Sequence, residues 1–285
     1  MKAKKIGGLV VLTVGLVTAT QICICGLAGA RGENGLSIQG STTVLPIAQA
    51  AAEEYMDLAD AGLVPEADIT VRGGGSGVGI AALLDGTIDI ADTSRPMKSQ
   101  EIEKAKKRGI EPFATVIAKD GIAVIVHPSN SVERLSMGDL QAIYTGQISE
   151  WSRMGGEAKS IVVISRDTAS GTFEIFKELV LKDEKVGGNS LMLASNQAVA
   201  TTVAKTPGAI GYVGLAYLSP EVKALEIDGV KPSQKTVVSE EYRLSRPLFM
   251  YTNGKPKGLV RKFVDFALSL AGQRIVEDLG FVPLR

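Results

Sequence analysis

From residue 35 to the C-terminus, short apolar segments typical of β-strands alternate with longer segments that have the periodicity of helices. The first pair is LSIQG (36–40), followed by the Ala-rich STTVLPIAQAAAEEYMDLA (41–59). Chains that alternate in this way form α/β folds with buried, mainly parallel strands. This alternation restricts the architecture more than any other feature. It predicts an α/β fold in which helices cover a mainly parallel sheet.

The alternation continues along the rest of the chain. Further strands are expected at 68–74, 87–92, 112–128, 161–165 and 246–254. The segment 112–128 is interpreted as two strands separated by Asp120-Gly121, since this dipeptide is common in tight turns. Further helices are expected at 76–86, 94–109, 137–146, from residue 170 onward, and at 257–280.

Hydroxyl side chains and glycines gather where predicted strands pass into predicted helices. The motifs are QGSTTV with Thr42 and Thr43, GGGSGVG with Ser76, ADTSRP with Ser94, and SRDTASGTFEIF with Arg166, Ser170, Gly171 and Thr172. In an open α/β sheet these turns lie at the carboxyl ends of the strands, where ligands bind. Helix-start N–H groups, hydroxyls and a forked guanidinium suit a small oxyanion. One such turn is an ordinary helix cap, but four on one side predict an anion pocket.

The first thirty residues differ in kind from the rest. MKAKK is basic, residues 6–27 are almost entirely apolar, and Ala28 and Ala30 fit a signal-peptidase site. The pattern predicts a signal peptide over residues 1–30 and an exported protein, periplasmic or at the cell surface. An uncleaved membrane anchor and lipidation of Cys25 are the alternatives. Cys23 and Cys25 are the only cysteines, so no thiol follows residue 30.

Charge and motif content exclude several classes of function. Loss of Lys2, Lys4 and Lys5 with the signal leaves 28 basic residues against 31 acidic ones, a formal charge of −3 that does not favour nucleic acid. GGGSGVG matches neither the P-loop nor the dinucleotide fingerprint, and no candidate serine lies in G-x-S-x-G. The single histidine, His127, ends an apolar strand. We therefore expect a binding protein without catalytic residues, metal or other cofactor.

Seven segments, in order along the chain, resemble the phosphate-binding subunit of ABC phosphate importers. They are GSTTVLPIAQAAAEEY, GGGSGVGIAAL, DIADTSRP, SRDTASGTFEIF, PGAIGYVGLAYL, SRPLFMYTNG and GFVPL. The resemblance implies the type II periplasmic-binding-protein fold, with two α/β lobes, each a mainly parallel sheet flanked by helices. Two crossing hinge strands, VIAKDGIAVIV and RPLFMYT, are expected to join them. Lobe 1 is expected at 36–118 plus 243–285, and lobe 2 at 119–242.

The resemblance also implies a ligand, a site and partners. Inorganic phosphate is expected at Thr42, Thr43, Ser76, Ser94, Arg166, Ser170, Gly171 and Thr172. A monomer would deliver it to the membrane permease subunits of an ABC transporter.

Two positions depart from the family pattern. Some members have aspartate where Ser94 and Thr168 stand. Asp92 and Asp167 are candidates to supply the missing carboxylate, and Asp92 is favoured because it shares the short turn with Ser94. Because of these departures, another tetrahedral oxyanion (sulfate, molybdate or tungstate) remains an alternative ligand. A secreted phosphoryl-transfer enzyme is the alternative from another class.

Overall fold

A computed structural model describes residues 34–284 of the chain. These described residues belong to one compact unit. The signal peptide predicted for residues 1–30, and the alternatives of an anchor or lipidation at Cys25, lie outside the described residues. Within residues 34–284, no helix combines the length and the apolar composition that a bilayer-crossing segment needs.

Most strands of residues 34–284 join one sheet of nine strands. Its order is β2-β1-β3-β11-β4-β8-β6-β7, with β9 on the side of β4, and β5 and β10 pair separately. The strands are β1 (Gly35–Gly40), β2 (Asp68–Arg72), β3 (Ile90–Thr93), β4 (Pro112–Val126), β5 (Arg134–Leu135), β6 (Val162–Arg166), β7 (Leu191–Leu193), β8 (Ala209–Gly214), β9 (Lys223–Ala224), β10 (Glu226–Ile227) and β11 (Ser245–Asn253).

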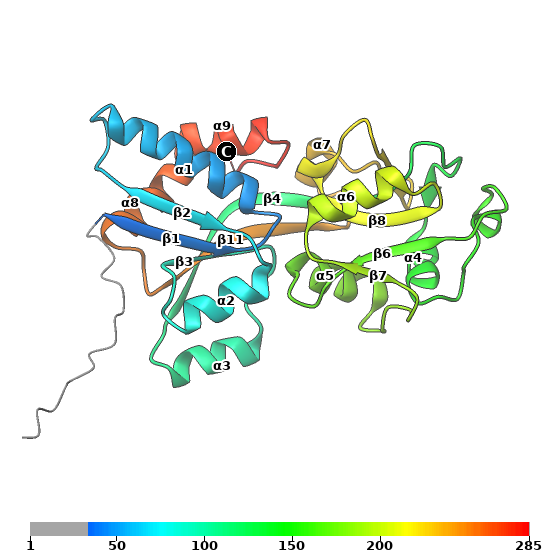
Figure 1. The fold of residues 1–285 in the computed structure, drawn as a ribbon, viewed down its shortest axis with the longest axis horizontal. Helices are drawn as coiled ribbons and strands as arrows, with labels where there is room; N and C mark the ends of the chain where they lie inside the picture. Colours follow the sequence, from blue (N-terminus) through cyan, green and yellow to red (C-terminus); the bar gives the residue numbers. More distant parts are fainter. Residues whose placement is uncertain (1–33, 285) are drawn as a thin grey trace, which may run out of the picture. The chain divides into compact units, whose positions relative to one another are not determined.

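Helices cover both faces of this sheet (Figure 1). The α-helices are α1 (Leu45–Asp60), α2 (Ser76–Leu84), α3 (Ser99–Lys107), α4 (Met137–Tyr144), α5 (Gly171–Phe176), α6 (Asn196–Lys205), α7 (Gln234–Val238), α8 (Gly258–Ala267) and α9 (Leu270–Asp278). Two 3₁₀ turns, η1 (Trp151–Met154) and η3 (Leu215–Tyr217), and a π-helical turn, η2 (Lys177–Leu181), complete the list. At one end of the sheet α1, α8 and α9 lie on one face and α2 and α3 on the other.

Two antiparallel strands in the middle connect two parallel groups. β1, β2 and β3 are parallel to one another, and so are β6, β7 and β8. The first part of β4 pairs with β11, and its last residues, Ile122–Val126, pair with β8. A single strand therefore runs from one parallel group to the other, and β11 crosses beside it.

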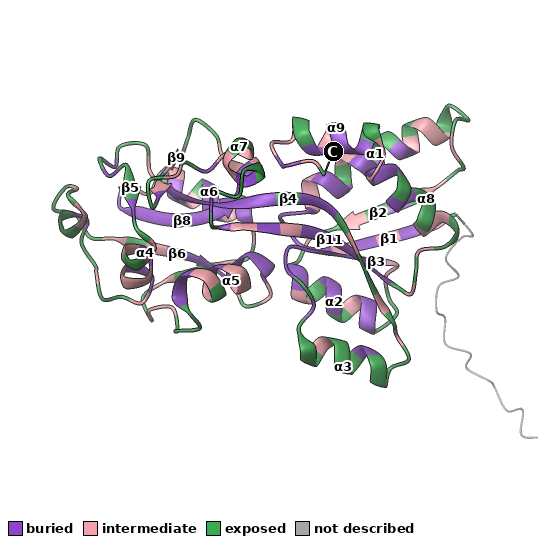
Figure 2. Ribbon diagram, turned by 180° about the vertical axis from the view of Figure 1, so that it is seen from behind, coloured by how far each residue is buried: buried purple, intermediate pink, exposed green. Residues whose placement is uncertain are grey.

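The side chains pack into separate cores on the two sides of this crossing. The N-terminal core contains buried residues from 36–118 and 248–281, on both faces of the β1–β3 group. The central core contains buried residues from 122–244, and it also takes in Val282. The half of β4 that enters the central core is buried along its whole length (Figure 2).

The structure corrects the expectation of two strands within 112–128. β4 is continuous through Asp120 and Gly121, and Gly121 has no left-handed backbone. A Cβ atom at Gly121 would lie 2.9 Å from a methyl group of Val237 and 3.2 Å from Leu215. Close packing against Val237 and Leu215 therefore requires a glycine at position 121. In the sequence, this Asp-Gly dipeptide cannot be distinguished from a turn.

The last predicted helix, 257–280, is in fact two helices. α8 ends before Leu268, and Ser269 caps α9 by accepting a hydrogen bond from the backbone N–H of Gly272 at 3.3 Å. A Cβ atom at Gly272 would lie 2.4 Å from the carbonyl oxygen of Phe266. The serine cap and the close approach at Gly272 permit this sharp break.

Two other predicted helices begin later than expected. α1 begins at Leu45, since Ser41–Val44 form a turn in which the Ser41 hydroxyl accepts hydrogen bonds from the N–H groups of Thr43 (3.1 Å) and Val44 (3.4 Å). α3 begins at Ser99, after the extended segment that contains Pro96. In both cases a segment assigned to a helix is a loop that carries hydroxyl groups.

Candidate anion-binding site

Four loops place hydroxyl groups at the junction of the two cores. Ser41–Val44 follow β1, Ser76 begins α2, Ser94 follows β3, and Ser170 caps α5, which follows β6. Each preceding strand belongs to a parallel group, so its carboxyl end points toward this junction. All of these side chains are at least nine-tenths buried.

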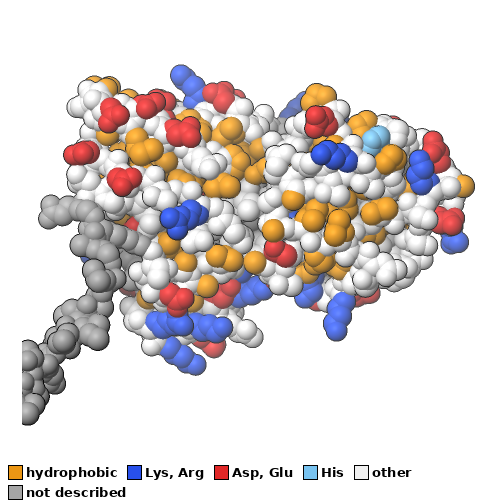
Figure 3. All heavy atoms as spheres, viewed as in Figure 1, with side chains coloured by type: hydrophobic (Ala, Val, Ile, Leu, Met, Phe, Trp, Pro, Cys, Tyr) orange, Lys and Arg blue, Asp and Glu red, His pale blue; other side chains and the backbone are white. Residues whose placement is uncertain are grey.

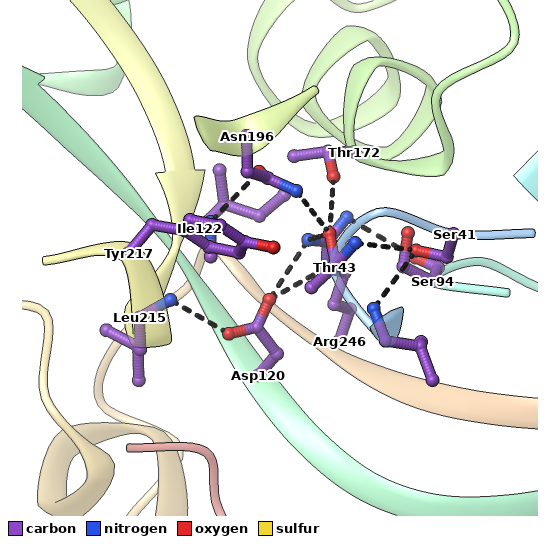
Figure 4. A network of polar contacts seen from close by, with 12 residues as sticks. Ser41, Thr43, Ser94, Asp120, Ile122, Thr172, Asn196, Leu215, Tyr217 and Arg246 are labelled. Atoms are coloured by element: carbon purple, nitrogen blue, oxygen red, sulfur yellow. Dashed lines mark hydrogen bonds and ion pairs between the residues drawn. The ribbon is translucent and has the colours of Figure 1, made fainter. Parts of the chain in front are cut away.

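The hydroxyls of the two cores contact one another. Thr43 Oγ1 of the N-terminal core lies 3.1 Å from Thr172 Oγ1 of the central core (Figure 4). Ser76 Oγ lies 3.4 Å from Ser94 Oγ and accepts a hydrogen bond from the Ser94 N–H at 3.0 Å. These four predicted residues, from segments up to 129 positions apart, therefore meet in one buried cluster.

Gly171 brings the start of α5 against this cluster. A Cβ atom at Gly171 would lie 2.4 Å from Ser76 Oγ and 2.6 Å from Ser94 Oγ. Real side chains do not tolerate such distances, so any residue larger than glycine would displace the hydroxyl groups of Ser76 and Ser94. Next to it, the Ser170 hydroxyl accepts a hydrogen bond from the N–H of Phe173 at 3.2 Å, and thus serves as the helix cap.

Arg166 is buried to 1% exposure at the end of β6. Its Nε and Nη2 atoms donate to the carbonyl oxygens of Leu193 (3.0 Å) and Ala194 (2.9 Å). Its Nη1 atom is buried and has no hydrogen-bond partner among the described residues. Burial lowers the pKa of the guanidinium, because the charged form loses its hydration. A fixed, buried cation with one free donor group favours a bound anion.

The two carbonyls replace the aspartate that the resemblance led us to look for at position 168. Thr168 is exposed, and Asp167 is half-buried with its carboxylate turned to the N–H of Ala169 at 3.1 Å. The orientation of Arg166 is therefore set by backbone oxygens, which no sequence motif reveals.

Asp92 lies at the end of β3, close to Ser94, with 1% of its surface exposed. Its Oδ1 atom has no hydrogen-bond partner among the described residues. Burial raises the pKa of this carboxyl group well above its usual value. Asp92 thus differs from ordinary loop carboxylates that face water.

Four residues that were not predicted join the cluster. Arg246 on β11 donates through Nη2 to Thr43 Oγ1 (3.2 Å) and pairs with Asp120 on β4 at 3.0 Å. Asn196, the first residue of α6, donates through Nδ2 to Thr43 Oγ1 at 3.0 Å (Figure 4). Tyr217 donates to the carbonyl oxygen of Thr42.

The sequence carried little signal for these four. Arg246 and Asp120 lie in segments that were interpreted only as hinge strands, and Arg166 was the one arginine named for the site. Burial raises the pKa of Asp120, and the Arg246 guanidinium opposes the shift. The one available clue was that Arg246 in SRPLF and Asp120 in AKDG are charged residues within apolar strand segments. Charged residues in such segments are rarely buried unless they form a pair.

The fold and this buried cluster define a periplasmic-binding-protein type of receptor, and a family model described as "PBP superfamily domain" matches residues 27–270. The chain is 34% identical to the phosphate-binding protein PstS of Bacillus subtilis (strain 168) over 278 residues, 91% of this chain and 88% of the relative. It is 31% identical to PstS of Borreliella burgdorferi over 262 residues, 88% of this chain and 90% of the relative. The chain belongs to the PstS family of the PBP superfamily.

Solved structures show the same architecture. A phosphate ABC transporter substrate-binding protein of Clostridium perfringens, solved with bound phosphate, matches with a TM-score of 0.81 at 33% identity, over 88% of this chain and all of that one. An ABC-type phosphate transport receptor of Vibrio cholerae matches with a TM-score of 0.70 at 28% identity, over 87% and 99%. The predicted type II periplasmic-binding-protein fold is thereby confirmed.

Proposed function

We propose that this protein captures inorganic phosphate between its two lobes outside the cytoplasm and delivers it to the permease subunits of an ABC transporter. The relatives named as phosphate-binding proteins, and the phosphate bound to the Clostridium perfringens protein, support the choice of ligand. Delivery to a permease is supported by the description of that protein as an ABC transporter component. We infer export from the predicted signal over residues 1–30, and we propose that the protein acts as a monomer without a cofactor.

The free Nη1 of Arg166 is the observation that carries this proposal. A buried guanidinium whose other nitrogens are fixed by carbonyls lacks only an anionic acceptor. The helix starts at Ser76, Ser170 and Thr172 supply hydroxyl and N–H donors at the positive ends of helices. We propose that all eight residues named from the sequence, Gly171 included, contact phosphate.

The energy of such a site suits a transport receptor. Micromolar binding needs about 8 kcal/mol. Hydrogen bonds to a charged group contribute about 1.5–3 kcal/mol each. A handful of them therefore supplies the required energy after the cost of ordering the lobes and the ligand.

We further propose that the two cores correspond to moving lobes, residues 36–118 with 243–285 and residues 119–242. The packing supports these limits except at the hinge, where Leu244 and Val282 join the central core. β4 and β11 run between the cores as continuous strands, so bending of these two strands would open the site.

Direct titration of the full chain with phosphate, sulfate, molybdate and tungstate tests the proposal. We expect phosphate to bind at least tenfold more tightly than the others. Equal affinity for sulfate would assign the site to tetrahedral oxyanions in general. Turnover of phosphate esters by the purified protein would instead favour the enzyme alternative.

Competition between phosphate and sulfate on Asp92→Asn tests how selectivity arises. Phosphate near neutral pH carries a proton that sulfate lacks, so an ionised carboxylate, which accepts but cannot donate, distinguishes the two. This role requires Asp92 to be ionised when phosphate is bound, although burial favours its neutral form in the apo protein. Asp92, with its free Oδ1, is the described carboxylate closest in sequence to Ser94. A reduced preference for phosphate in the variant is expected, and an unchanged preference would exclude Asp92 from the role.

A further inference from the structure

The hydroxyl of Thr43 has more hydrogen-bond partners than the other hydroxyls of the site. Its oxygen lies 3.0 Å from Asn196 Nδ2, 3.2 Å from Arg246 Nη2 and 3.1 Å from Thr172 Oγ1 (Figure 4). Asn196 and Arg246 have no part in the site as proposed above. Their role depends on which group of each contact donates the hydrogen and which accepts it.

The orientation of the Asn196 amide is fixed by the backbone of β8. The N–H of Gly214 points at Asn196 Oδ1, at 3.3 Å, and an N–H group can only donate. The oxygen of the amide must therefore face Gly214 and its nitrogen must face the threonines. The two hydrogens of Nδ2 are then directed to Thr43 Oγ1 and, at 3.3 Å, to Thr42 Oγ1.

The orientation of Arg246 is fixed by Asp120 in the same way. Asp120 Oδ2 accepts from Arg246 Nε (3.3 Å) and Nη2 (3.0 Å), while its Oδ1 accepts from the N–H of Leu215 (3.0 Å). Both side chains of this pair are at most 1% exposed. The pair lies on the two crossing strands and holds the second hydrogen of Nη2 toward Thr43.

A hydroxyl group has two acceptor lone pairs and one hydrogen to donate. Arginine and an amide nitrogen are donors only, so Asn196 and Arg246 occupy both lone pairs of Thr43. We propose that Asn196 and Arg246 are positioning residues that restrict Thr43 to the role of hydrogen-bond donor, toward Thr172 or a bound phosphate oxygen. When Thr172 accepts this bond, its own hydrogen is available for the ligand. This inference rests on the proposed function.

The arrangement links donor orientation to closure. Thr43 and the N-terminal core lie on one side of the crossing strands, whereas Asn196 begins a helix of the central core. The Asn196 contact forms only when the two cores are together, while the Arg246 contact comes from the crossing strand itself. The Thr43 hydroxyl is therefore fully oriented only when the two cores are together, because only then do both Asn196 Nδ2 and Arg246 Nη2 donate to its oxygen.

A double-mutant cycle on the full chain tests the proposal, with the phosphate dissociation constant as the readout. Thr43→Val removes the hydroxyl at constant shape, and Asn196→Ala removes one of its donors. Each is expected to weaken phosphate binding about tenfold, as expected for loss of one bond to a charged ligand. Because Asn196 acts mainly through Thr43, adding Asn196→Ala to Thr43→Val should weaken binding by less than about twofold more, and this remainder accounts for the longer bond from Asn196 to Thr42 Oγ1.

Two further variants separate positioning from folding. Thr43→Ser keeps the hydroxyl and should retain wild-type affinity. Gln273→Ala removes another buried amide, which donates to the carbonyl oxygens of Ile117 and Ala267 rather than to a hydroxyl of the cluster. It should lower the unfolding temperature without changing the affinity. If Asn196→Ala does not fold, the cycle is run with Arg246→Lys, for which the same coupling to Thr43 is expected.

The inference would be overturned if the fold losses of phosphate affinity in the two single variants multiplied in the double variant. Wild-type affinity in Asn196→Ala would also overturn it. Neither result would affect the proposed function, provided that the wild-type protein binds phosphate in the first titration. A wild-type protein that binds no phosphate would refute the proposed function, and the inference with it.

Discussion

Arg166 combines burial, fixed geometry and a free donor in one side chain. Two of its nitrogens are bound to carbonyl oxygens, and Nη1 alone is left without a partner among residues 34–284. Lysine has no planar fork and cannot donate to both carbonyls and to a ligand with this geometry. Position 166 therefore requires arginine, and substitution of Arg166 measures how much it contributes to phosphate binding.

Arg166→Ala is expected to lower phosphate affinity by an amount on the order of 3–5 kcal/mol, because it leaves a buried anion without its cation. Arg166→Lys should recover only part of this loss. Arg261→Ala, which removes an exposed arginine of α8, is the matched control and should bind as the wild type does. Calorimetric titration measures all three. Wild-type affinity in Arg166→Ala would remove Arg166 from the site.

Asp92 makes a separate prediction about stability. Its pKa is raised in the folded protein by burial, whereas an unfolded aspartate titrates near 3.9. Above that pH the folded state holds more protons than the unfolded state, so the free energy of unfolding falls as the pH rises toward the folded pKa. The Asp92 carboxyl group therefore destabilises the apo protein at neutral pH.

Asp92→Asn should remove this penalty. The variant should unfold at a higher temperature than the wild type near pH 7, and the difference should shrink as the pH is lowered toward 4. Thermal unfolding of both proteins without ligand, between about pH 4 and pH 8, measures the effect. A variant that is less stable at every pH would show that the carboxyl group has a native partner that the amide cannot replace.

At the scale of the elements, the start of α5 depends on Gly171. The nearest atoms to a Cβ at this position are the hydroxyl oxygens of Ser76 and Ser94, which are proposed ligands. An alanine would force these hydroxyls out of their present positions. The same α5 turn meets α2 again where the N–H of Gly77 donates to the carbonyl oxygen of Ala169 at 2.9 Å.

Gly171→Ala should therefore weaken phosphate binding at least tenfold while each core keeps its own stability. Gly188→Ala is the matched control, because a Cβ atom there meets no atom within 4 Å and its backbone is not left-handed. The control should bind normally. Equal affinities for both glycine variants would mean that the contact between α2 and α5 is not needed for binding.

The sequence predicted the alternation of elements because apolar periodicity is a local property. It placed β1, β2, β6 and α2 within a few residues of their observed bounds. It did not distinguish the close packing of Gly121 from a turn, because the neighbours Val237 and Leu215 are distant in sequence. The break between α8 and α9 rests on local contacts of Ser269 and Gly272, and it was missed because residues 257–280 were interpreted as one amphipathic helix.

The hydroxyls of the site were predictable because they belong to helix starts with recognisable motifs. Asn196 and Arg246 were not, since a lone asparagine at a helix start also fits an ordinary cap and Arg246 lies inside a strand. Their proximity to Thr43 arises only from the crossing of β4 and β11. The carbonyl oxygens that hold Arg166 leave no trace in the sequence at all.

At the scale of the whole molecule, several polar contacts join the two cores. Besides the hydroxyl cluster, Lys98 at the start of α3 pairs with Glu174 of α5 at 2.8 Å. Lysine and arginine side chains also gather over α3 on the face shown in Figure 3, whereas the rest of that face carries charges of both signs. Among the described residues, the Lys98–Glu174 pair is the one ion pair that joins the start of α3 to the central core.

Closure should be driven by the ligand and only assisted by this ion pair. The two side chains are 47% and 22% exposed, and exposed pairs contribute about 0–1 kcal/mol. A ligand that binds only the closed form shifts the population toward it. Small-angle scattering of the wild type is expected to show a smaller radius of gyration at saturating phosphate than without phosphate.

Lys98→Glu places two carboxylates opposite each other and opposes closure without touching the ligand. Its phosphate affinity should fall by no more than about fivefold, in line with the strength of a surface pair, and the loss should shrink at high salt. The swapped pair Lys98→Glu with Glu174→Lys should restore the affinity. If Lys98→Glu loses affinity and the swap fails to recover it, the effect arises from Lys98 attracting the anion rather than from the contact between lobes. Two results together would argue against closure as the binding step: a wild-type scattering profile that phosphate does not change, and wild-type affinity in Lys98→Glu.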